Sequence, residues 1–109
     1  MRLQFLGKAG SDKNNCPTLY ASDQGSFIVQ GWETDEAGTV EIPHVLLGFA
    51  RWNTFLDSPL TDTGRGTFTV SGRPVTDGEA LSQMTLDRNE TAIEVPKAER
   101  TFYGGNLAQ

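Results

Sequence analysis

The clearest pattern in the chain is an alternation of apolar and polar residues that occurs twice. Residues 25–31 read Gly-Ser-Phe-Ile-Val-Gln-Gly, and residues 66–72 read Gly-Thr-Phe-Thr-Val-Ser-Gly. Phe27 and Val29 share one face of the first segment, as expected for a strand with a period of two. The other face would hold Ser26, Ile28 and Gln30. Each segment therefore predicts a strand with one well-buried face, bounded by glycines that mark turns or close backbone approach.

A second block repeats in the same order further along the chain. Residues 40–44 read Val-Glu-Ile-Pro-His, and residues 93–97 read Ile-Glu-Val-Pro-Lys. Phe49 and Phe102 each lie six residues beyond the proline of their block. Two blocks in order indicate an internal duplication. The alternative is a pair of ordinary strands that share β-forming residues and turn glycines.

The two copies span residues 17–52 and 59–103, and they are unequal in length. The second copy has 22 positions from Gly72 to Glu94, whereas the first has 10 from Gly31 to Glu41, a difference of 12. The extra residues come from about 76–89. Residues 76–79, Thr-Asp-Gly-Glu, match a capping box in which the Thr hydroxyl and the Glu carboxylate bind free amides, and they predict a helix inside the insertion.

The remaining elements follow from turn signals and apolar spacing. Further strands are expected at residues 2–6, 18–22, 39–42 and 91–95. A helix is expected at 43–52, with Val45, Phe49 and Trp52 on its apolar face and Leu46 and Ala50 widening that face. Another is expected at 96–103, ending at Gly104-Gly105. Residues 53–66 would connect the copies through turns.

These elements predict a β-rich α+β fold in a single domain of residues 1–109. Two pseudo-symmetric three-stranded antiparallel units would form one sheet or a partly open barrel. A short helix would follow each Glu-Ile/Val-Pro block. Neither unit has enough strands to be stable without the other or a covering helix.

Composition and charge narrow the function. The chain carries 9 Lys and Arg against 14 Asp and Glu, a net charge of −5. The basic residues are scattered, which argues against direct nucleic-acid binding and fits a basic protein partner instead. No apolar stretch approaches the roughly 20 residues of a membrane span or forms a signal peptide, so we expect a cytoplasmic protein without membrane contact.

The residues that carry chemistry are few and isolated. Cys16 and His44 are the only cysteine and histidine, and neither has neighbouring metal ligands, so we expect no metal, no cofactor and no Cys-His catalytic pair. The segment Gly7-Lys8-Ala9-Gly10-Ser11 lacks the spacing of a phosphate-binding loop. We assign no catalytic residue and consider an enzyme the weaker alternative.

Candidate interaction residues lie where the two copies differ. Trp32 in the first copy corresponds to Arg73 in the second, and His44 corresponds to Lys97. A large aromatic residue just beyond a turn is either a core plug or an anchor of the kind enriched at interfaces, and both readings stay open for Trp32. For Trp52 we expect a place in the core.

Several short motifs of the chain are similar to those of a known group of proteins. They are Leu3-Gln4-Phe5-Leu6-Gly7-Lys8, Pro17-Thr18-Leu19-Tyr20, Val29-Gln30-Gly31-Trp32 and Glu41-Ile42-Pro43, with Glu94-Val95-Pro96-Lys97 fitting the ending. By these motifs the chain resembles small uncharacterised actinobacterial proteins. Cys16 stands where their motif has serine, and the middle of the first copy is shorter than theirs. The resemblance implies a gene beside a helix-turn-helix regulator and a role as its protein partner in a regulatory or toxin–antitoxin-like pair.

Three functions follow from these observations. The first is a non-enzymatic protein–protein interaction or regulatory module, with a helix-turn-helix regulator as the expected partner. The second is a small ligand-binding protein or enzyme with a cleft between the two halves. The third is a self-assembling structural protein, a homo-oligomer that pairs through exposed edge strands.

Overall fold

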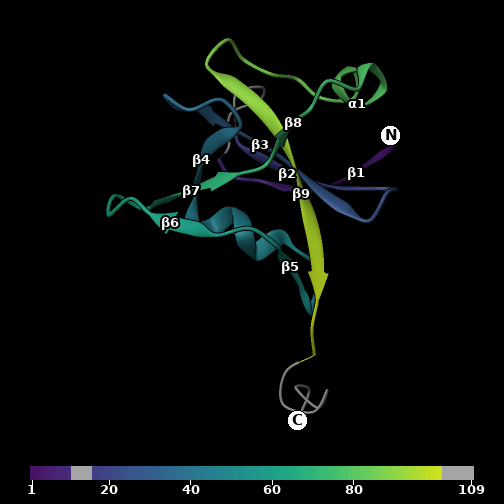
Figure 1. The fold of residues 1–109 in the computed structure, drawn as a ribbon, viewed down its shortest axis with the longest axis horizontal. Helices are drawn as coiled ribbons and strands as arrows, with labels where there is room; N and C mark the ends of the chain where they lie inside the picture. The colour runs from purple at the N-terminus through teal and green to yellow at the C-terminus, as the bar shows by residue number, and fades with distance from the viewer. Residues whose placement is uncertain (11–15, 102–109) are drawn as a thin grey trace.

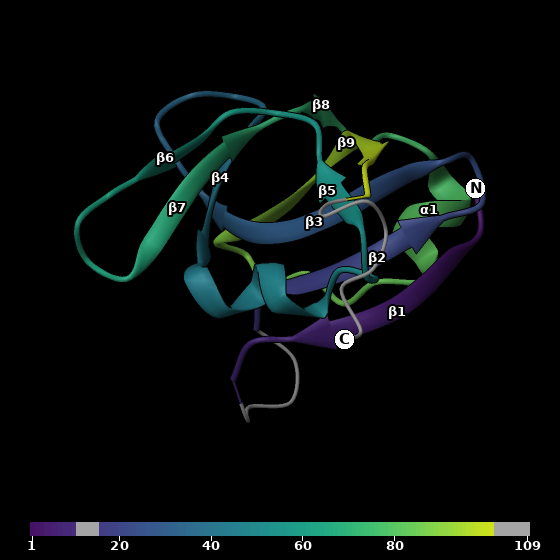
Figure 2. The ribbon, with the colours of Figure 1, turned by 90° about the horizontal axis from the view of Figure 1, so that it is seen from below.

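The computed structural model describes residues 1–10 and 16–101. It is an antiparallel sheet of nine strands with two short helices, so the β-rich α+β class predicted from the sequence is confirmed. The strands run along a continuous path, β1-β2-β3-β4-β7-β6, and β9 joins this path by pairing with β3. The β6–β7 hairpin and helix α1 lie at opposite ends of the molecule (Figures 1 and 2). The elements in chain order are β1 (Leu3–Lys8), β2 (Thr18–Ser22), β3 (Ser26–Glu33), β4 (Thr39–Pro43), the 3₁₀ helix η1 (His44–Phe49), β5 (Thr54–Leu56), β6 (Leu60–Asp62), β7 (Thr67–Ser71), β8 (Arg73–Pro74), α1 (Gly78–Ser82) and β9 (Glu90–Glu99).

The strands of the two predicted copies pair with each other. Phe27 and Val29 of β3 lie opposite Val95 and Ile93 of β9. In the same register, Phe68 and Val70 of β7 lie opposite Ile42 and Val40 of β4. Each copy therefore supplies one strand to each of two equivalent ladders. The duplication itself stays a prediction.

Two short strand pairings, β3 with β4 and β8 with β9, are also equivalent in the two copies. Trp32 pairs with Glu41 where β3 meets β4, and Arg73 pairs with Glu94 where β8 meets β9. In the sequence alignment of the copies, Arg73 corresponds to Trp32 and Glu94 to Glu41. β7 and β8 of the second copy, separated only by Gly72, therefore correspond together to β3 of the first copy.

The core lies between these ladders and uses both copies. Its buried apolar side chains come from β2, β3, β4, η1, β7 and β9, and burial of such side chains is the main favourable contribution to folding. The buried cluster consists of Leu19, Phe27, Val29, Val40, Ile42, Leu46, Val70, Ile93 and Val95.

The expectation of a single buried face on residues 26–31 is incomplete. Ile28 and Gln30, on the second face of β3, are 0% and 2% exposed. The insertion between β8 and β9 covers this face, since the backbone carbonyl of Thr85 accepts a hydrogen bond from Gln30. Ala80 of α1, which lies within this insertion, is also fully buried.

The helix predicted at residues 43–52 is a shorter 3₁₀ helix, and its expected core face is only partly correct. Leu46 is fully buried and Ala50 packs against the core, as expected, while Val45 and Trp52 are 61% and 73% exposed. A 3₁₀ helix has three residues per turn, so the spacing of an α-helix does not predict which side chains share its buried side.

The helix predicted at residues 96–103 is also wrong within the described residues, because β9 continues as a strand to Glu99. The carbonyl of Pro96 accepts a hydrogen bond from Asp57, and β5 then pairs with residues 97–99. Residues 53–66 thus contain strands β5 and β6 as well as turns. Phe102, Gly104-Gly105 and the rest of residues 102–109 lie outside the described residues.

Helix α1 forms where the insertion was expected to contain one. Its N-cap is Asp77, whose carboxylate accepts a hydrogen bond from the amide of Ala80, so the cap lies one residue beyond the predicted Thr76. The side chain of Gln83 then connects this helix to the start of β1, accepting from the amide of Leu3 at 2.9 Å and donating to the carbonyl of Met1 at 2.8 Å.

Two glycines provide a stability test of the interlocked ladders. A Cβ atom at Gly72 would lie 2.5 Å from the carbonyl oxygen of Glu94, and one at Gly31 would lie 2.9 Å from that of Glu41. We expect Gly72→Ala to lower the free energy of unfolding by about 2–3 kcal/mol, since the neighbouring backbone must move, and Gly31→Ala to act in the same direction. Urea denaturation measures this change.

Gly48→Ala is the matched control, because a Cβ atom there would have no atom within 4 Å. Its free energy of unfolding should stay within about 0.5 kcal/mol of the wild type or rise slightly. Equal urea midpoints for Gly72→Ala and the wild type would contradict the close approach of β8 and β9.

Candidate functional site

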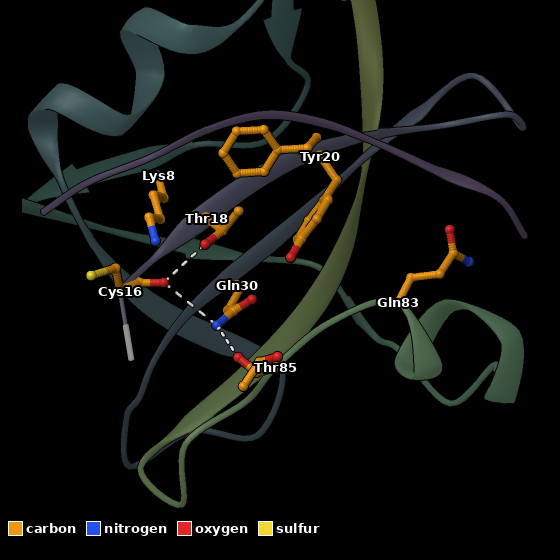
Figure 3. A pocket seen from close by; sticks show the side chains of 8 residues that line it. Lys8, Cys16, Thr18, Tyr20, Gln30, Gln83 and Thr85 are labelled. Atoms are coloured by element: carbon orange, nitrogen blue, oxygen red, sulfur yellow. Dashed lines mark hydrogen bonds between the residues drawn. The ribbon is translucent and has the colours of Figure 1, made fainter. Parts of the chain in front are cut away.

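A small polar hollow lies between the sheet of the first copy and the insertion of the second. Its volume is about 150 Å³, less than the roughly 300 Å³ of the smallest pockets that hold drug-sized ligands. The side chains that line it converge from β1, β2, β3 and the insertion (Figure 3). We call this site the polar hollow; it is lined by Phe5, Lys8, Cys16, Thr18, Tyr20, Gln30, Gln83 and Thr85.

Strand register brings these side chains together. Lys8 of β1 lies opposite Thr18 of β2, and Thr18 lies opposite Gln30 of β3, so the three form a row across the sheet. Tyr20 follows Thr18 by two residues and therefore shares its face. Phe5 lies opposite Tyr20, and the two rings meet edge to face with centroids 6.2 Å apart.

Gln30 occupies the centre of a buried hydrogen-bond network. Its Nε2 donates to the carbonyl of Thr85 at 2.8 Å and to Oε1 of Glu90 at 3.0 Å, with a longer contact of 3.5 Å to the carbonyl of Cys16. All of these partners are acceptors, which fixes the orientation of the amide. The amide oxygen of Gln30 therefore faces away from these acceptors, and it is itself buried from solvent.

Two oxygens of this network have no donor among the described residues. They are Oε1 of Gln30 and Oε2 of Glu90, and the two side chains belong to residues that are only 2% and 5% exposed. The other carboxylate oxygen of Glu90 accepts from both Gln30 and the amide of Asp87. An unpaired buried acceptor lowers the free energy of unfolding by about 1–3 kcal/mol, so these two oxygens are a local source of instability.

Tyr20 supplies a hydroxyl that stays protonated at neutral pH. Partial burial of the ring raises the pKa of Tyr20 above its ordinary value, and the negative charge of Glu90 raises it further. The hydroxyl points into the polar hollow (Figure 3). The hollow is therefore lined by a neutral phenol and by the side chain of Lys8, whereas the unpaired oxygens of Gln30 and Glu90 are buried.

The four predicted interaction residues are dispersed over the molecule. Within residues 1–10 and 16–101, no hydrogen bond or ion pair joins any two of them. Trp32 is half-buried at the end of β3. Lys97 is half-buried on β9 and lies 3.5 Å from the carboxylate of Glu99.

His44 and Arg73 contact residues of neighbouring strands. The ring of His44 lies against Phe68, with centroids 4.1 Å apart, and its Nε2 is 3.2 Å from the carbonyl oxygen of Thr67. Arg73 donates to Oε1 of Glu94 at 2.8 Å. An interaction role for these residues stays a prediction.

A second candidate surface lies at the end of the molecule formed by η1, β5 and the end of β9. Five large apolar residues of the described chain are exposed, and four of them fall within residues 45–55. We call these four the apolar strip: Val45, Phe49, Trp52 and Phe55. Trp52, expected in the core, is instead the most exposed of them at 73%.

The tryptophan borders a shallow depression of about 360 Å³ that also includes Asn53, Thr54, Glu99, Arg100 and Thr101. The pairing of β5 with β9 creates it, because Thr54 lies directly opposite Glu99. The sequence interpretation missed this site, since it assigned Trp52 to a helix face and residues 97–99 to another helix.

The described part of the chain shows neither a metal-binding cluster nor a membrane-spanning helix. Residues 1–10 and 16–101 contain no group of three or more His, Cys, Asp or Glu side chains arranged to hold a metal ion. No helix within these ranges is long and apolar enough to cross a membrane.

Glu41 and Glu94, two half-buried glutamates, occupy equivalent positions in the ladders. Glu94 receives hydrogen bonds from Arg73 and from the hydroxyl of Ser26, and both lower the pKa of its carboxyl group. The hydroxyl of Thr67 and then the guanidinium of Arg65 lower the pKa of Glu41 in the same way. These contacts join the two copies.

The lowered pKa values predict how stability depends on pH. Because the folded protein holds these carboxyls ionised below their ordinary value of 4.5, their stabilisation is complete above that pH and is lost as the pH falls through the folded values. We expect a Glu41→Gln, Glu94→Gln variant to be about 1 kcal/mol less stable than the wild type at pH 7. Near pH 3 the gap should shrink, as urea denaturation at the two pH values measures.

Glu36→Gln is the control, because Glu36 is exposed in a turn and its carboxylate forms none of these bonds. Its unfolding curve should match that of the wild type at both pH values. A stability gap of the double variant that is equally large at pH 3 and pH 7 would show that these carboxylates do not stabilise the fold through their charge.

Comparisons of the chain with protein-family models, with curated proteins and with solved structures find no match. The resemblance to small actinobacterial proteins therefore stays a prediction, and so does the regulator expected as a partner.

Proposed function

We propose that this protein is a non-enzymatic interaction module that binds a basic protein partner through the apolar strip. The observation that carries the proposal is the concentration of exposed apolar side chains, four of five, within residues 45–55. Single exposed apolar residues are ordinary, whereas several close together favour an interaction site, and these four lie on η1, on β5 and on the turn between them. Aromatic residues such as Trp52 are also the ones that most often dominate binding energy at interfaces.

The surroundings of Trp52 favour a basic contact. The carboxylate of Glu99, whose side chain is 70% exposed, lines the same depression as the indole ring and Arg100, and it lies 3.5 Å from Nζ of Lys97, with which a basic group of the partner would share it. An arginine or lysine of the partner can stack on the indole face and form an ion pair with this carboxylate. Cation–π stacking combined with an ion pair would select a basic side chain over a neutral one.

The charge of the whole chain points to the same class of partner. Its net charge of −5 attracts a basic protein over a distance of about a Debye length. Helix-turn-helix regulators are basic where they neutralise DNA phosphates, and such a regulator is the partner that the resemblance implies. Within this proposal the protein acts in the cytoplasm and does not contact nucleic acid itself.

The sheet edges favour a different protein over a second copy of this chain. β1 has a register shift between Phe5 and Gly7, and it ends in Lys8. β6, at the other end of the path, has three residues and includes the exposed Asp62. Bulges, lysines and short charged edge strands are features by which proteins prevent edge-to-edge pairing.

Truncation of the tryptophan tests the proposal. We expect Trp52→Ala to weaken binding of the purified regulator encoded beside this gene at least about 30-fold, because it removes the anchor of the strip. Glu99→Gln should weaken binding less and reduce its dependence on salt concentration. Isothermal titration calorimetry at two salt concentrations measures both effects.

Phe5→Ala is the matched control, since Phe5 is 59% exposed but lies beside the polar hollow. It should bind the regulator like the wild type. The proposal fails if the regulator does not bind, or if Trp52→Ala binds with wild-type affinity. It also fails if light scattering shows a homodimer that Trp52→Ala dissociates, because the strip would then bind a second copy.

A further inference from the structure

The chain consists of two halves that are joined by two strand ladders. The first half runs from β1 to η1, and the second half runs from β5 to β9. Among the described residues, only β3 with β9 and β4 with β7 pair across the halves. The other pairs lie within one half: β1 to β4 pair in order, β5 and β8 pair with β9, and β6 pairs with β7.

The contacts across the two ladders are reciprocal. The hydroxyl of Ser26 in the first half donates to the carboxylate of Glu94 in the second half at 2.7 Å. In the opposite sense, the hydroxyl of Thr67 in the second half donates to the carboxylate of Glu41 in the first half. A half from a second copy of the chain would present the same strands in the same register. Two chains could therefore exchange halves and keep all of these contacts.

The covalent connection between the halves is one tight turn of residues 51–54. The amide of Thr54 donates to the carbonyl of Arg51 at 3.0 Å and closes the turn. Asn53 at its third position has a φ of 63°, and it is the one residue other than glycine with a positive φ within residues 1–10 and 16–101. A side chain disfavours this conformation, so straightening the turn relieves strain. Short, strained hinge loops are the ones that promote exchange of elements between chains.

We propose that this protein forms a dimer with a second copy of itself by exchanging halves at Asn53. The first half of each chain then pairs with the second half of the other, and the turn becomes an extended hinge. The exchanged dimer needs neither the sheet edges nor the apolar strip, so it goes beyond the proposed function. Separation of the chains would require both ladders to break, and the dimer should therefore dissociate slowly.

The first arm of the experiment refolds the full chain from urea at micromolar and at millimolar concentration. We expect a dimer after refolding at millimolar concentration, because exchange between chains then competes with closure within one chain. Size-exclusion chromatography with light scattering at micromolar concentration measures the dimer share, which should persist for hours. A chain that stays monomeric after refolding at millimolar concentration, or a dimer that dissociates at once on dilution, would overturn the proposal.

The second arm changes the hinge residue. Asn53→Gly removes the strain of the closed turn, because glycine adopts a positive φ readily. Asn53→Val increases the strain, because a β-branched residue disfavours a positive φ and favours extended backbone. After refolding at millimolar concentration, the dimer share of Asn53→Val should exceed that of Asn53→Gly about tenfold. Equal dimer shares would contradict the role of the hinge.

Gly64→Val is the matched control for backbone strain. Gly64 has a φ of 83° in the turn between β6 and β7, and a Cβ atom there would have no atom within 4 Å. Valine therefore strains this turn without a steric clash. Because β6 and β7 belong to the same half, the dimer share should equal that of the wild type. An increase as large as that of Asn53→Val would show that general destabilisation causes the dimer.

The third arm distinguishes exchanged halves from two intact chains in contact. The hydroxyl oxygens of Thr39 and Ser71 lie 2.7 Å apart across the β4–β7 ladder, so cysteines at both positions can form a disulfide. In the exchanged dimer each disulfide joins two chains, and the oxidised dimer of Thr39→Cys, Ser71→Cys should stay covalent on a non-reducing gel. Separation into single chains would overturn the proposal. Thr39→Cys alone is the control for random cross-links, since the native thiol of Cys16 is only 6% exposed.

Isotope-labelled chains provide a second measurement in case the double-cysteine variant does not fold. Equal amounts of nitrogen-labelled and carbon-labelled wild-type chain are refolded together at millimolar concentration, and the dimer is isolated. Val40 and Val70 lie opposite each other in the β4–β7 ladder. Isotope-filtered NMR should therefore detect contacts between Val40 of one chain and Val70 of the other. Contacts within one chain only would contradict the exchange.

Trp52→Ala separates this proposal from the proposed function. Its indole is 73% exposed and belongs to neither ladder, so the dimer share of this variant should stay within about twofold of the wild type. A monomeric wild type that binds the regulator would overturn the exchange and leave the proposed function intact. An exchanged dimer whose monomer fails to bind the regulator would have the opposite meaning.

Discussion

The pairing of β3 with β9 is the constraint on which the rest of the structure depends. β3 lies at the centre of the sheet, with β2 along one edge and β9 along the other, and its C-terminal end reaches β4. Because β9 follows β3 by more than fifty residues, the central ladder forms only when distant parts of the sequence meet. The core behind it then takes Phe27 and Val29 from one part and Ile93 and Val95 from the other. Neither copy can complete a core without its partner.

The sequence anticipated that β2, β3 and β4 pair in order, but not that β3 also pairs with β9 and β4 with β7. An alternation with a period of two assigns each side chain to a face and leaves the neighbouring strand undetermined. The strand partners of residues 96–99 show the consequence. Proline at the start of a segment is compatible with a helix or with a strand, and β5 decides for the strand by pairing with Lys97 and Glu99. Tertiary contacts thus decided between two structures that the local sequence allowed.

The candidate sites were less predictable for a similar reason. A glutamine on the second face of a strand predicts contact with solvent, and only the insertion that covers β3 turns Gln30 into a buried residue. The unpaired oxygen of Glu90 follows from the same fold and has no signature in the sequence. Trp52 was assigned to the core because its spacing from Phe49 and Val45 fits an α-helix, whereas the segment forms a tighter turn.

Both candidate sites arise where the symmetry of the two copies ends. The position equivalent to Gln30 in the second copy is Ser71, which is exposed and hydrogen-bonded to Thr39 at 2.7 Å. Ser71 stays exposed, because the short turn of the first copy does not cover that strand as the insertion of the second copy covers β3. The apolar strip likewise uses residues of η1 and of the segment that joins the copies. A symmetric pair of ladders therefore provides a stable core, and the additional segments are free to specialise for binding without disturbing the register that holds the core together.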